Sequence, residues 1–143
     1  MRTQAMFIGL MSGTSMDGVD GVLANLNDHD GRASVLASAS RPFPPALRAE
    51  LLALNTPGDN ELHRAALAAN ALVRIYAQVV ADVLASGQVQ ASDVRAIGAH
   101  GQTVRHRPQE FDGTGYTLQL NQPALLAEPV SYTHLTLPTK RIV

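Results

Sequence analysis

The segment Ser12–Asp20 concentrates residue types that bind phosphate groups in proteins. Gly13 and Gly18 allow the main chain to approach an anion closely and to adopt positive φ angles. The hydroxyls of Thr14 and Ser15 add to the main-chain N–H groups as hydrogen-bond donors toward phosphate oxygens. The segment is therefore predicted to form a phosphate-binding loop.

Two carboxylates in the same segment extend this prediction to a metal ion. Asp17 and Asp20 are acceptors that could hold the water shell of magnesium, which usually keeps several of its waters. The loop has no Walker A lysine and leads into a strand, so it is not a P-loop. A glycine-rich hairpin turn without a ligand remains an equal alternative on loop chemistry alone, because Asp-Gly is a common hairpin signal.

A second group of polar residues follows an apolar strand predicted at Val94–Ala99. This strand is expected to deliver His100, Gln102 and Thr103 to a loop, a usual way to build a site in an α/β protein. The side chains of Gln102 and Thr103 can donate to and accept from the hydroxyls of a sugar. Arg105 follows, and its guanidinium can bind a carboxylate in bidentate fashion.

Interpretations in which these residues bind no ligand also remain open. For Arg105, His106 and Arg107, a solvated basic loop is slightly favoured over a binding role. Metal ligation by His100 and His106 is not expected, because no third ligand has matching spacing. A buried, hydrogen-bonded His100 is the preferred alternative.

Three strands are predicted to position the phosphate-type loop. Apolar runs at Ala5–Met11 and Val19–Leu26 flank it, which indicates a β-hairpin with the loop at its tip. A third strand, Arg32–Phe43, alternates with period two and is expected to pair antiparallel with the second. The side chains expected on one side of this strand are Val35, Ala37 and Ala39.

The predicted helices follow these strands. Pro44-Pro45 should end the third strand and begin a short helix over Ala46–Leu54. A long helix capped by Asp59 or Asn60 should end at Ser86-Gly87 and serve in the core, without a ligand role. Its apolar stripe is Leu62, Ala66, Ala69, Val73, Tyr76, Val80 and Val83. A strand over Tyr116–Leu120 and a helix over Pro123–Glu128 complete the set.

Size and composition exclude several classes of protein. The 143 residues, 45% of them hydrophobic and 16% charged, are enough for one globular domain with a core. A formal net charge of −1 gives no reason to expect nucleic acid or an anionic membrane as a partner. No apolar stretch is expected to reach the length of a membrane span. The absence of cysteine excludes disulfides and thiolate sites and suits a cytoplasmic location.

Three blocks of the sequence resemble the anhydro-N-acetylmuramic acid kinase family, whose members recycle bacterial peptidoglycan. They are GLMSGTSMDGVDGV (residues 9–22), GAHGQTVRHRP (residues 98–108) and TLQLNQPALLAE (residues 117–128). The blocks occur in family order, and the resemblance covers Met6–Glu128. It implies an α/β fold, the N-terminal lobe of an actin-like ATPase (ribonuclease H-like) over residues 1–128, which is incomplete.

The resemblance also implies ligands and site residues. ATP with Mg2+ is the expected cofactor, and an amino sugar is the expected second partner, with no nucleic acid or membrane and with a homodimer as one expected state of the full-length form. The cofactor-binding residues implied are Gly13, Thr14, Ser15, Met16, Asp17, Gly18, Val19 and Asp20. The substrate-binding residues implied are His100, Gln102, Thr103 and Arg105. No individual metal ligand is assigned.

The similarity to the family stops at Pro129. The family continues into a strand that carries its general base, an aspartate in a motif like ADFR, whereas this chain continues as PVSYTHLTLPTKRIV. The tail, residues 129–143, resembles translated adapter sequence and is expected not to be native; a genuine edge strand at Tyr132–Leu137 is the alternative. We therefore expect an N-terminal fragment without a catalytic residue and without kinase activity of its own.

Two other functions remain as alternatives. One is a non-catalytic module that binds nucleotide or pairs with another chain. The other is a different sugar or acetate kinase of the same superfamily, against which HGQTVRHRP argues.

Overall fold

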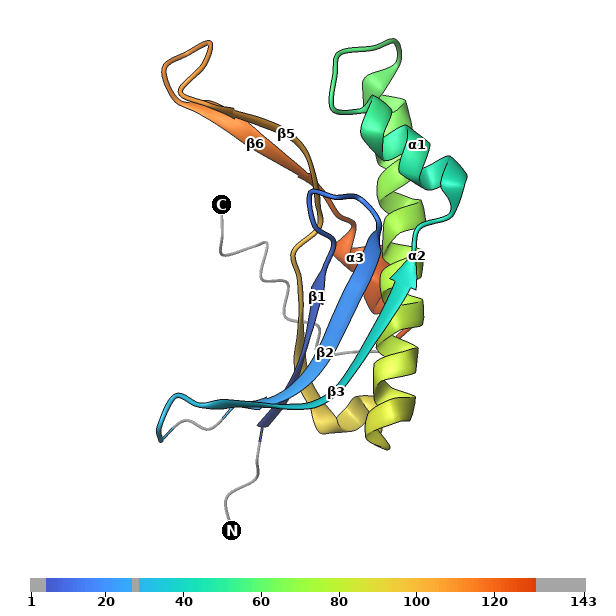
Figure 1. The fold of residues 1–143 in the computed structure, drawn as a ribbon, viewed down its shortest axis with the longest axis vertical. Coiled ribbons are helices and arrows are strands. Elements are labelled where there is room, and N and C mark those ends of the chain that lie inside the picture. The colour runs from blue at the N-terminus through green and yellow to red at the C-terminus, as the bar shows by residue number, and fades with distance from the viewer. Residues whose placement is uncertain (1–4, 27–28, 131–143) are drawn as a thin grey trace.

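The computed structural model describes residues 5–26 and 29–130, which form an α/β arrangement of one mixed sheet, a separate β-ribbon and packed helices (Figure 1). The main sheet has the strand order β3-β2-β1-β4. This architecture confirms the α/β fold class expected from the sequence.

The predicted hairpin is confirmed. Strand β1 (Ala5–Met11) pairs antiparallel with β2 (Gly18–Leu26), and Met11 lies opposite Asp20 where the loop begins. A Cβ atom at Gly21 would come within 2.5 Å of a Val79 side-chain carbon, so this glycine allows the long helix to approach the sheet closely.

Strand β3 (Ala33–Pro42) pairs antiparallel with β2, as expected. The alternation predicted for its side chains is wrong at one place, because the pairing of β3 with β2 shifts register between Leu23 and Ala24. Ala37 remains in the core, whereas Val35 on the far side of the shift is 65% exposed. A β-bulge between the two residues places Val35 on the other face of the strand from Ala37, which simple alternation does not anticipate.

Two helices follow. Helix α1 (Pro45–Ala53) begins with the expected proline, and helix α2 (Glu61–Gly87) runs along one face of the sheet (Figure 1). The predicted stripe is confirmed from Ala69 onward but is wrong at the start of α2, where Leu62 is 92% exposed and Ala66 is also exposed. The residues buried along α2 are Ala68, Ala69, Leu72, Val73, Ile75, Tyr76, Val79, Val80 and Val83.

The start of α2 lacks the predicted side-chain cap. Asn60 occupies the cap position with φ 57°, in the left-handed region, and makes no side-chain cap hydrogen bond. Arg64 of the helix donates instead from its side chain to the carbonyl of Asp59, at 3.0 Å. This hydrogen bond fixes the segment that leads into α2.

Within the described part of the chain, α2 has the length and composition of a membrane-crossing helix, contrary to the expectation that no stretch would reach that length. Half of its most apolar window is buried inside the structure. A core helix that packs on a sheet can have the same length and apolar composition as a membrane-crossing helix.

The remaining elements position the second polar block. A 3-10 turn (Ala91–Asp93) leads into β4 (Val94–Ala99), which pairs parallel with β1. Strands β5 (Gln102–Pro108) and β6 (Gly115–Leu120) form a projecting two-stranded ribbon, and helix α3 (Pro123–Ala127) follows (Figure 1). The loop predicted from His100 is therefore shorter than expected, and the segment 105–107 is a strand rather than a basic loop.

The opposite face of the main sheet carries exposed apolar groups. Met11 is 54% exposed and Val22 is 37% exposed. With Gly9 and Gly98 they line a cavity of about 530 Å³. The alternative edge strand at residues 132–137, like most of the predicted tail, lies outside the described residues.

Candidate functional site

The loop between β1 and β2 contains a tight turn with an exposed apex. The N–H of Met16 donates to the carbonyl of Gly13 at 3.1 Å and closes the turn. Thr14 and Ser15 at its apex are exposed, and neither their N–H groups nor their hydroxyls have a partner in the part of the chain that the structure describes. These free donors are what a phosphate group requires.

The two glycines of the loop do not adopt the positive φ angles expected from the sequence. The residue in the left-handed region is Met16, with φ 55°, and its side chain is buried. A Cβ atom at Gly18 would lie 2.2 Å from the carbonyl oxygen of Arg41, so Gly18 is required by the close approach of β3. At Gly13 the nearest atom would be Ser15 Oγ at 3.9 Å, which leaves that side open to a ligand.

The loop borders a cavity of about 440 Å³ that brings most of the predicted cofactor-binding set together. Thr14 lies outside its lining, and Met16 points into the core beneath the loop. Val19 is also buried. The predicted residues that line the cavity are Gly13, Ser15, Asp17, Gly18, Val19 and Asp20, joined by Met11 and by Ser40, Arg41 and Pro42 of β3.

The two carboxylates at this cavity have different partners. Asp17 is largely exposed, with Oδ1 3.8 Å from Nε of Arg48 on α1. Asp20 Oδ1 accepts a hydrogen bond of 2.5 Å from Ser40 Oγ on β3. No group of three or more metal-ligating side chains occurs within residues 5–26 and 29–130. Two carboxylates at one cavity would fit Mg2+ if a phosphate group were bound beside them, because this ion is commonly held by one or two carboxylates plus phosphate oxygens.

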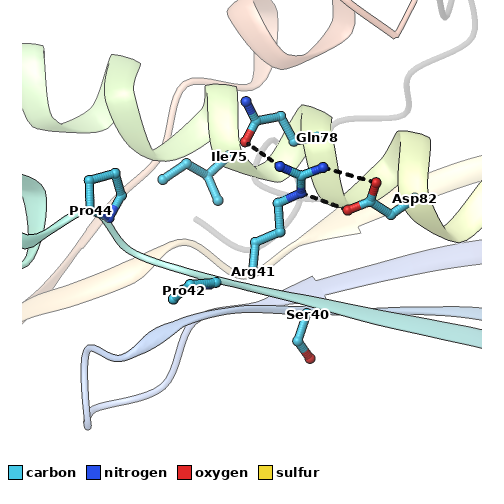
Figure 2. Close-up of a pocket in the computed structure, with 7 residues that line it drawn as sticks. All are labelled: Ser40, Arg41, Pro42, Pro44, Ile75, Gln78 and Asp82. Atoms are coloured by element: carbon cyan, nitrogen blue, oxygen red, sulfur yellow. Dashed lines mark hydrogen bonds and ion pairs between the residues drawn. The ribbon is translucent and has the colours of Figure 1, made fainter.

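A second cavity, of about 530 Å³, lies next to the first between β3 and α2 (Figure 2). The guanidinium of Arg41 crosses it and donates to Asp82 twice, from Nε to Oδ2 at 2.7 Å and from Nη2 to Oδ1 at 3.1 Å. This pairing lowers the pKa of Asp82 and raises that of Arg41. Arg41 is thus held by α2 and directed away from the loop.

Sequence reasoning missed Ser40, Arg41 and Arg48 as neighbours of the loop. Ser40 lies opposite Asp20 in the register of β3 with β2, so the pairing itself was the signal that could have found it. Arg48 depends on the orientation of α1, for which the sequence offered no signal.

On the second polar block, His100 is exposed rather than buried as preferred from the sequence. Its Nδ1 lies 3.1 Å from the Gly101 carbonyl, and its Nε2 lies 2.9 Å from the Gln119 side-chain nitrogen. Nδ1 therefore donates to Gly101 and Nε2 accepts from Gln119, which is one neutral tautomer.

Gln102 and Thr103 begin β5 close to the phosphate-type loop. The side chain of Gln102 is fully buried, and its Nε2 donates to the carbonyls of Gly13 and Thr103, each at 3.1 Å. Its Oε1 has no partner among the described residues. Thr103 is half-buried. The structure thus joins Gln102 to the loop, although the sequence had assigned the two to different sides of the site.

Arg105 lies apart from these residues and is already paired. Its side chain is 11% exposed, its Nη2 forms an ion pair with Glu61 Oε1, and its Nε donates to the carbonyl of Leu54 at 3.1 Å. A carboxylate ligand would have to share or replace Glu61 at this guanidinium.

A buried serine and tyrosine support the loop from below. Ser12 Oγ lies 3.3 Å from the Tyr76 hydroxyl and donates to the carbonyl of Gly101 at 3.2 Å. Burial raises the pKa of Tyr76, and the hydrogen bond with Ser12 acts in the opposite direction. The sequence placed Tyr76 in the core but did not indicate this polar contact.

Comparisons with known proteins identify the family. The family model described as anhydro-N-acetylmuramic acid kinase matches residues 5–136. Curated proteins with that name are similar over most of this chain. The protein from Variovorax paradoxus is 70% identical over 123 residues, which is 86% of this chain and 32% of the relative. The one from Albidiferax ferrireducens is 67% identical over 123 residues, 86% of this chain and 31% of the relative.

A third relative, from Bordetella pertussis, is 66% identical over 124 residues, which is 86% of this chain and 31% of the relative. The chain therefore spans about a third of the length of the curated relatives it matches. Because the family model covers residues 5–136 of the 143, which include all the described residues, the chain belongs to the anhydro-N-acetylmuramic acid kinase family.

Proposed function

We propose that the full-length form of this chain is a kinase that uses ATP and water to open and phosphorylate 1,6-anhydro-N-acetylmuramic acid. The product is N-acetylmuramic acid 6-phosphate, and the place of action is the cytoplasm. The observation that carries the proposal is a loop with free donors at the wall of a cavity, in a chain of this family.

The reaction balances as a hydrolysis joined to a phosphoryl transfer. Water attacks the anomeric carbon and gives a proton to a carboxylate base, for which the family's aspartate beyond residue 128 is the candidate. The bond from the anomeric carbon to the 6-oxygen breaks, and the freed 6-oxygen takes the γ-phosphoryl group of ATP, releasing ADP. Such a base contributes ~10²–10⁴-fold to a rate.

In this proposal the described residues bind and orient rather than react. The donors of Gly13, Thr14 and Ser15 hold phosphate oxygens, because these donors have no partner among the described residues. Asp17 and Asp20 orient the water shell of Mg2+, which would supply charge neutralisation for phosphoryl transfer. Main-chain groups of Met16, Gly18 and Val19 form the rest of the proposed nucleotide-binding surface.

The sugar side is assigned to the second block. His100 is exposed beside Gln119, and Thr103 is half-buried next to Gln102, so both can meet sugar hydroxyls. Arg105 would bind the lactyl carboxylate, which requires it to share or leave Glu61. Gln102 belongs to the same sequence block, but its side chain is buried beneath the exposed residues of that block.

The test uses a full-length fusion, in which the 123 matched residues of this chain are joined to the part of the Variovorax paradoxus relative beyond its matched segment. With magnesium, ATP and the anhydro-sugar, mass spectrometry should detect the 6-phosphate and ADP in equal amounts. The 143-residue chain alone should give no product, because it spans about a third of such a protein. Absence of product from a folded fusion would overturn the proposed function.

A further inference from the structure

A buried polar junction joins the end of β1 to the segment between β4 and β5. Ser12 donates to the Gly101 carbonyl, and Gln102 Nε2 donates to the Gly13 carbonyl across 89 positions of the sequence. The N–H of His100 also donates to the carbonyl of Leu10, at 3.0 Å. Three hydrogen bonds thus hold the two chain segments together beneath the loop.

The orientation of the Gln102 amide is fixed by its partners. Both groups that face Nε2 are carbonyl oxygens, Gly13 O and Thr103 O, and these can only accept. A flipped amide would place Oε1 against two acceptors. Gln102 Oε1 is left buried without a donor among the described residues, and such an unsatisfied group in a native protein calls for an explanation.

The hydrogen bond to Gly13 has a consequence for the next residue. Gly13 C=O and Thr14 N–H belong to one peptide unit, and in a trans peptide these two groups point in opposite directions. Because Gln102 and the Met16 N–H hold the carbonyl inward, the Thr14 N–H points outward. Two accepted hydrogen bonds also polarise the peptide and strengthen its N–H as a donor.

The other end of the junction is equally constrained. Gly101 has φ 85°, and a Cβ atom there would lie 2.6 Å from the Leu120 carbonyl oxygen. Asn121 donates from its side chain to the carbonyl of Ala99 at 3.0 Å. The segment that carries Gln102 is therefore fixed against both β4 and β6.

We propose that Gln102 is a positioning residue for phosphate binding, which holds the Gly13–Thr14 peptide with its N–H directed at the nucleotide. It acts through this peptide and touches neither substrate. This inference rests on the proposed function for the identity of the ligand. It assigns Gln102 to the phosphate side instead of to a direct sugar contact.

The test compares variants of the full-length fusion. Gln102→Met keeps the length of the side chain and removes its donors, and Gln122→Met is the matched control, because Gln122 is exposed and its side chain has no partner among the described residues. Calorimetry with Mg-ATP should show a dissociation constant raised about tenfold for Gln102→Met and unchanged for Gln122→Met. The KM for the sugar should change less than that for ATP.

A second pair of variants tests the Thr14 N–H directly. Thr14→Pro removes this N–H and preserves the turn, since Thr14 follows the first residue of the Gly13–Met16 turn, where proline is favoured. Thr14→Val removes only the hydroxyl. Thr14→Pro should weaken Mg-ATP binding at least as much as Gln102→Met, and more than Thr14→Val. This pair remains informative if Gln102→Met does not fold.

The outcomes separate the inference from the proposed function. A fusion that binds Mg-ATP but makes no sugar phosphate would contradict the function, while the shifts in dissociation constant would still decide the role of Gln102. Dissociation constants within about twofold of the parent for both Gln102→Met and Thr14→Pro would overturn the inference. A fusion that binds no Mg-ATP would overturn both.

Discussion

The two sides of the candidate site differ in what their polar groups already bond. On the phosphate side, Thr14 and Ser15 are exposed, and their donors have no partner among residues 5–26 and 29–130. On the sugar side, Arg105 is paired with Glu61 and His100 is bonded to Gln119. If the proposed site assignment holds, the phosphate side is preorganised for its ligand, whereas the sugar side has to exchange internal partners for ligand atoms.

The largest expected effect comes from filling the open space at the loop. In the full-length fusion, Gly13→Val should raise the KM for ATP by about ten- to a hundredfold, because the side chain would fill the space proposed for a phosphate group, at a cost of about 1–3 kcal/mol. The chain itself should accept the change, since the nearest atom to a new Cβ is 3.9 Å away. Steady-state kinetics measures the KM for ATP, and urea unfolding checks that the variant is as stable as the parent. Unchanged ATP kinetics would show that the loop does not bind the nucleotide.

The same hairpin contains a glycine whose role is packing. Gly18→Ala should lower the free energy of unfolding by about 1–3 kcal/mol or more, because its Cβ would lie 2.2 Å from the Arg41 carbonyl oxygen. Gly98→Ala is the control, since a Cβ there meets nothing within 4 Å. Urea unfolding of both variants, followed by circular dichroism, measures the difference. Equal stability of the two would show that β3 can move away from β2 at low cost.

The sequence predicted the elements well where local patterns determine them. The hairpin followed from two apolar runs around a glycine-rich loop, and α2 followed from its repeat of apolar residues. The expected turn at Asp17-Gly18 is wrong, because the turn closes between Gly13 and Met16 and Gly18 already belongs to β2. The pattern failed at Leu62 because the periodicity of a helix does not show where the sheet beneath it ends. It failed at Val35 because a bulge changes the face of a strand without changing its composition.

The candidate site was predicted only as two separate blocks. The loop residues are consecutive, so their grouping around one cavity required only the hairpin. The bond from Gln102 to Gly13 joins residues 89 positions apart, and the pairing of Arg105 with Glu61 joins residues 44 apart. Such contacts depend on how the elements pack, which residue types and spacing alone do not determine.

A smaller effect is expected from releasing Arg105 on the sugar side. Glu61→Gln removes the charge that competes with a ligand carboxylate, so in the full-length fusion it should lower the KM for the anhydro-sugar by about two- to tenfold. Arg105→Ala should raise this KM and leave the KM for ATP unchanged. If Glu61→Gln weakens sugar binding as much as Arg105→Ala does, the ion pair is structural and the carboxylate binds elsewhere.

The smallest effect concerns the tyrosine beneath the loop and appears only at alkaline pH. Burial raises the pKa of Tyr76, so the unfolded chain releases this proton at a lower pH than the folded chain does. The stability linked to Tyr76 is complete below about pH 10 and falls above it, by at most about 1.4 kcal/mol per pH unit. Tyr76→Phe should be less stable than the parent at neutral pH, because the contact with Ser12 is lost, and the difference should narrow as the pH rises.

Ser12→Ala tests the same contact from the other side. The hydrogen bond with Ser12 lowers the pKa of Tyr76, so its loss should raise that pKa further. The alkaline loss of stability should then extend over a wider range of pH in Ser12→Ala than in the parent, whereas in Tyr76→Phe this contribution is absent. Urea unfolding at several pH values between 8 and 11 measures all three chains. Parallel curves for the three would show that the Tyr76 hydroxyl is accessible to water in solution, and that the support beneath the phosphate side is looser than its buried contacts indicate.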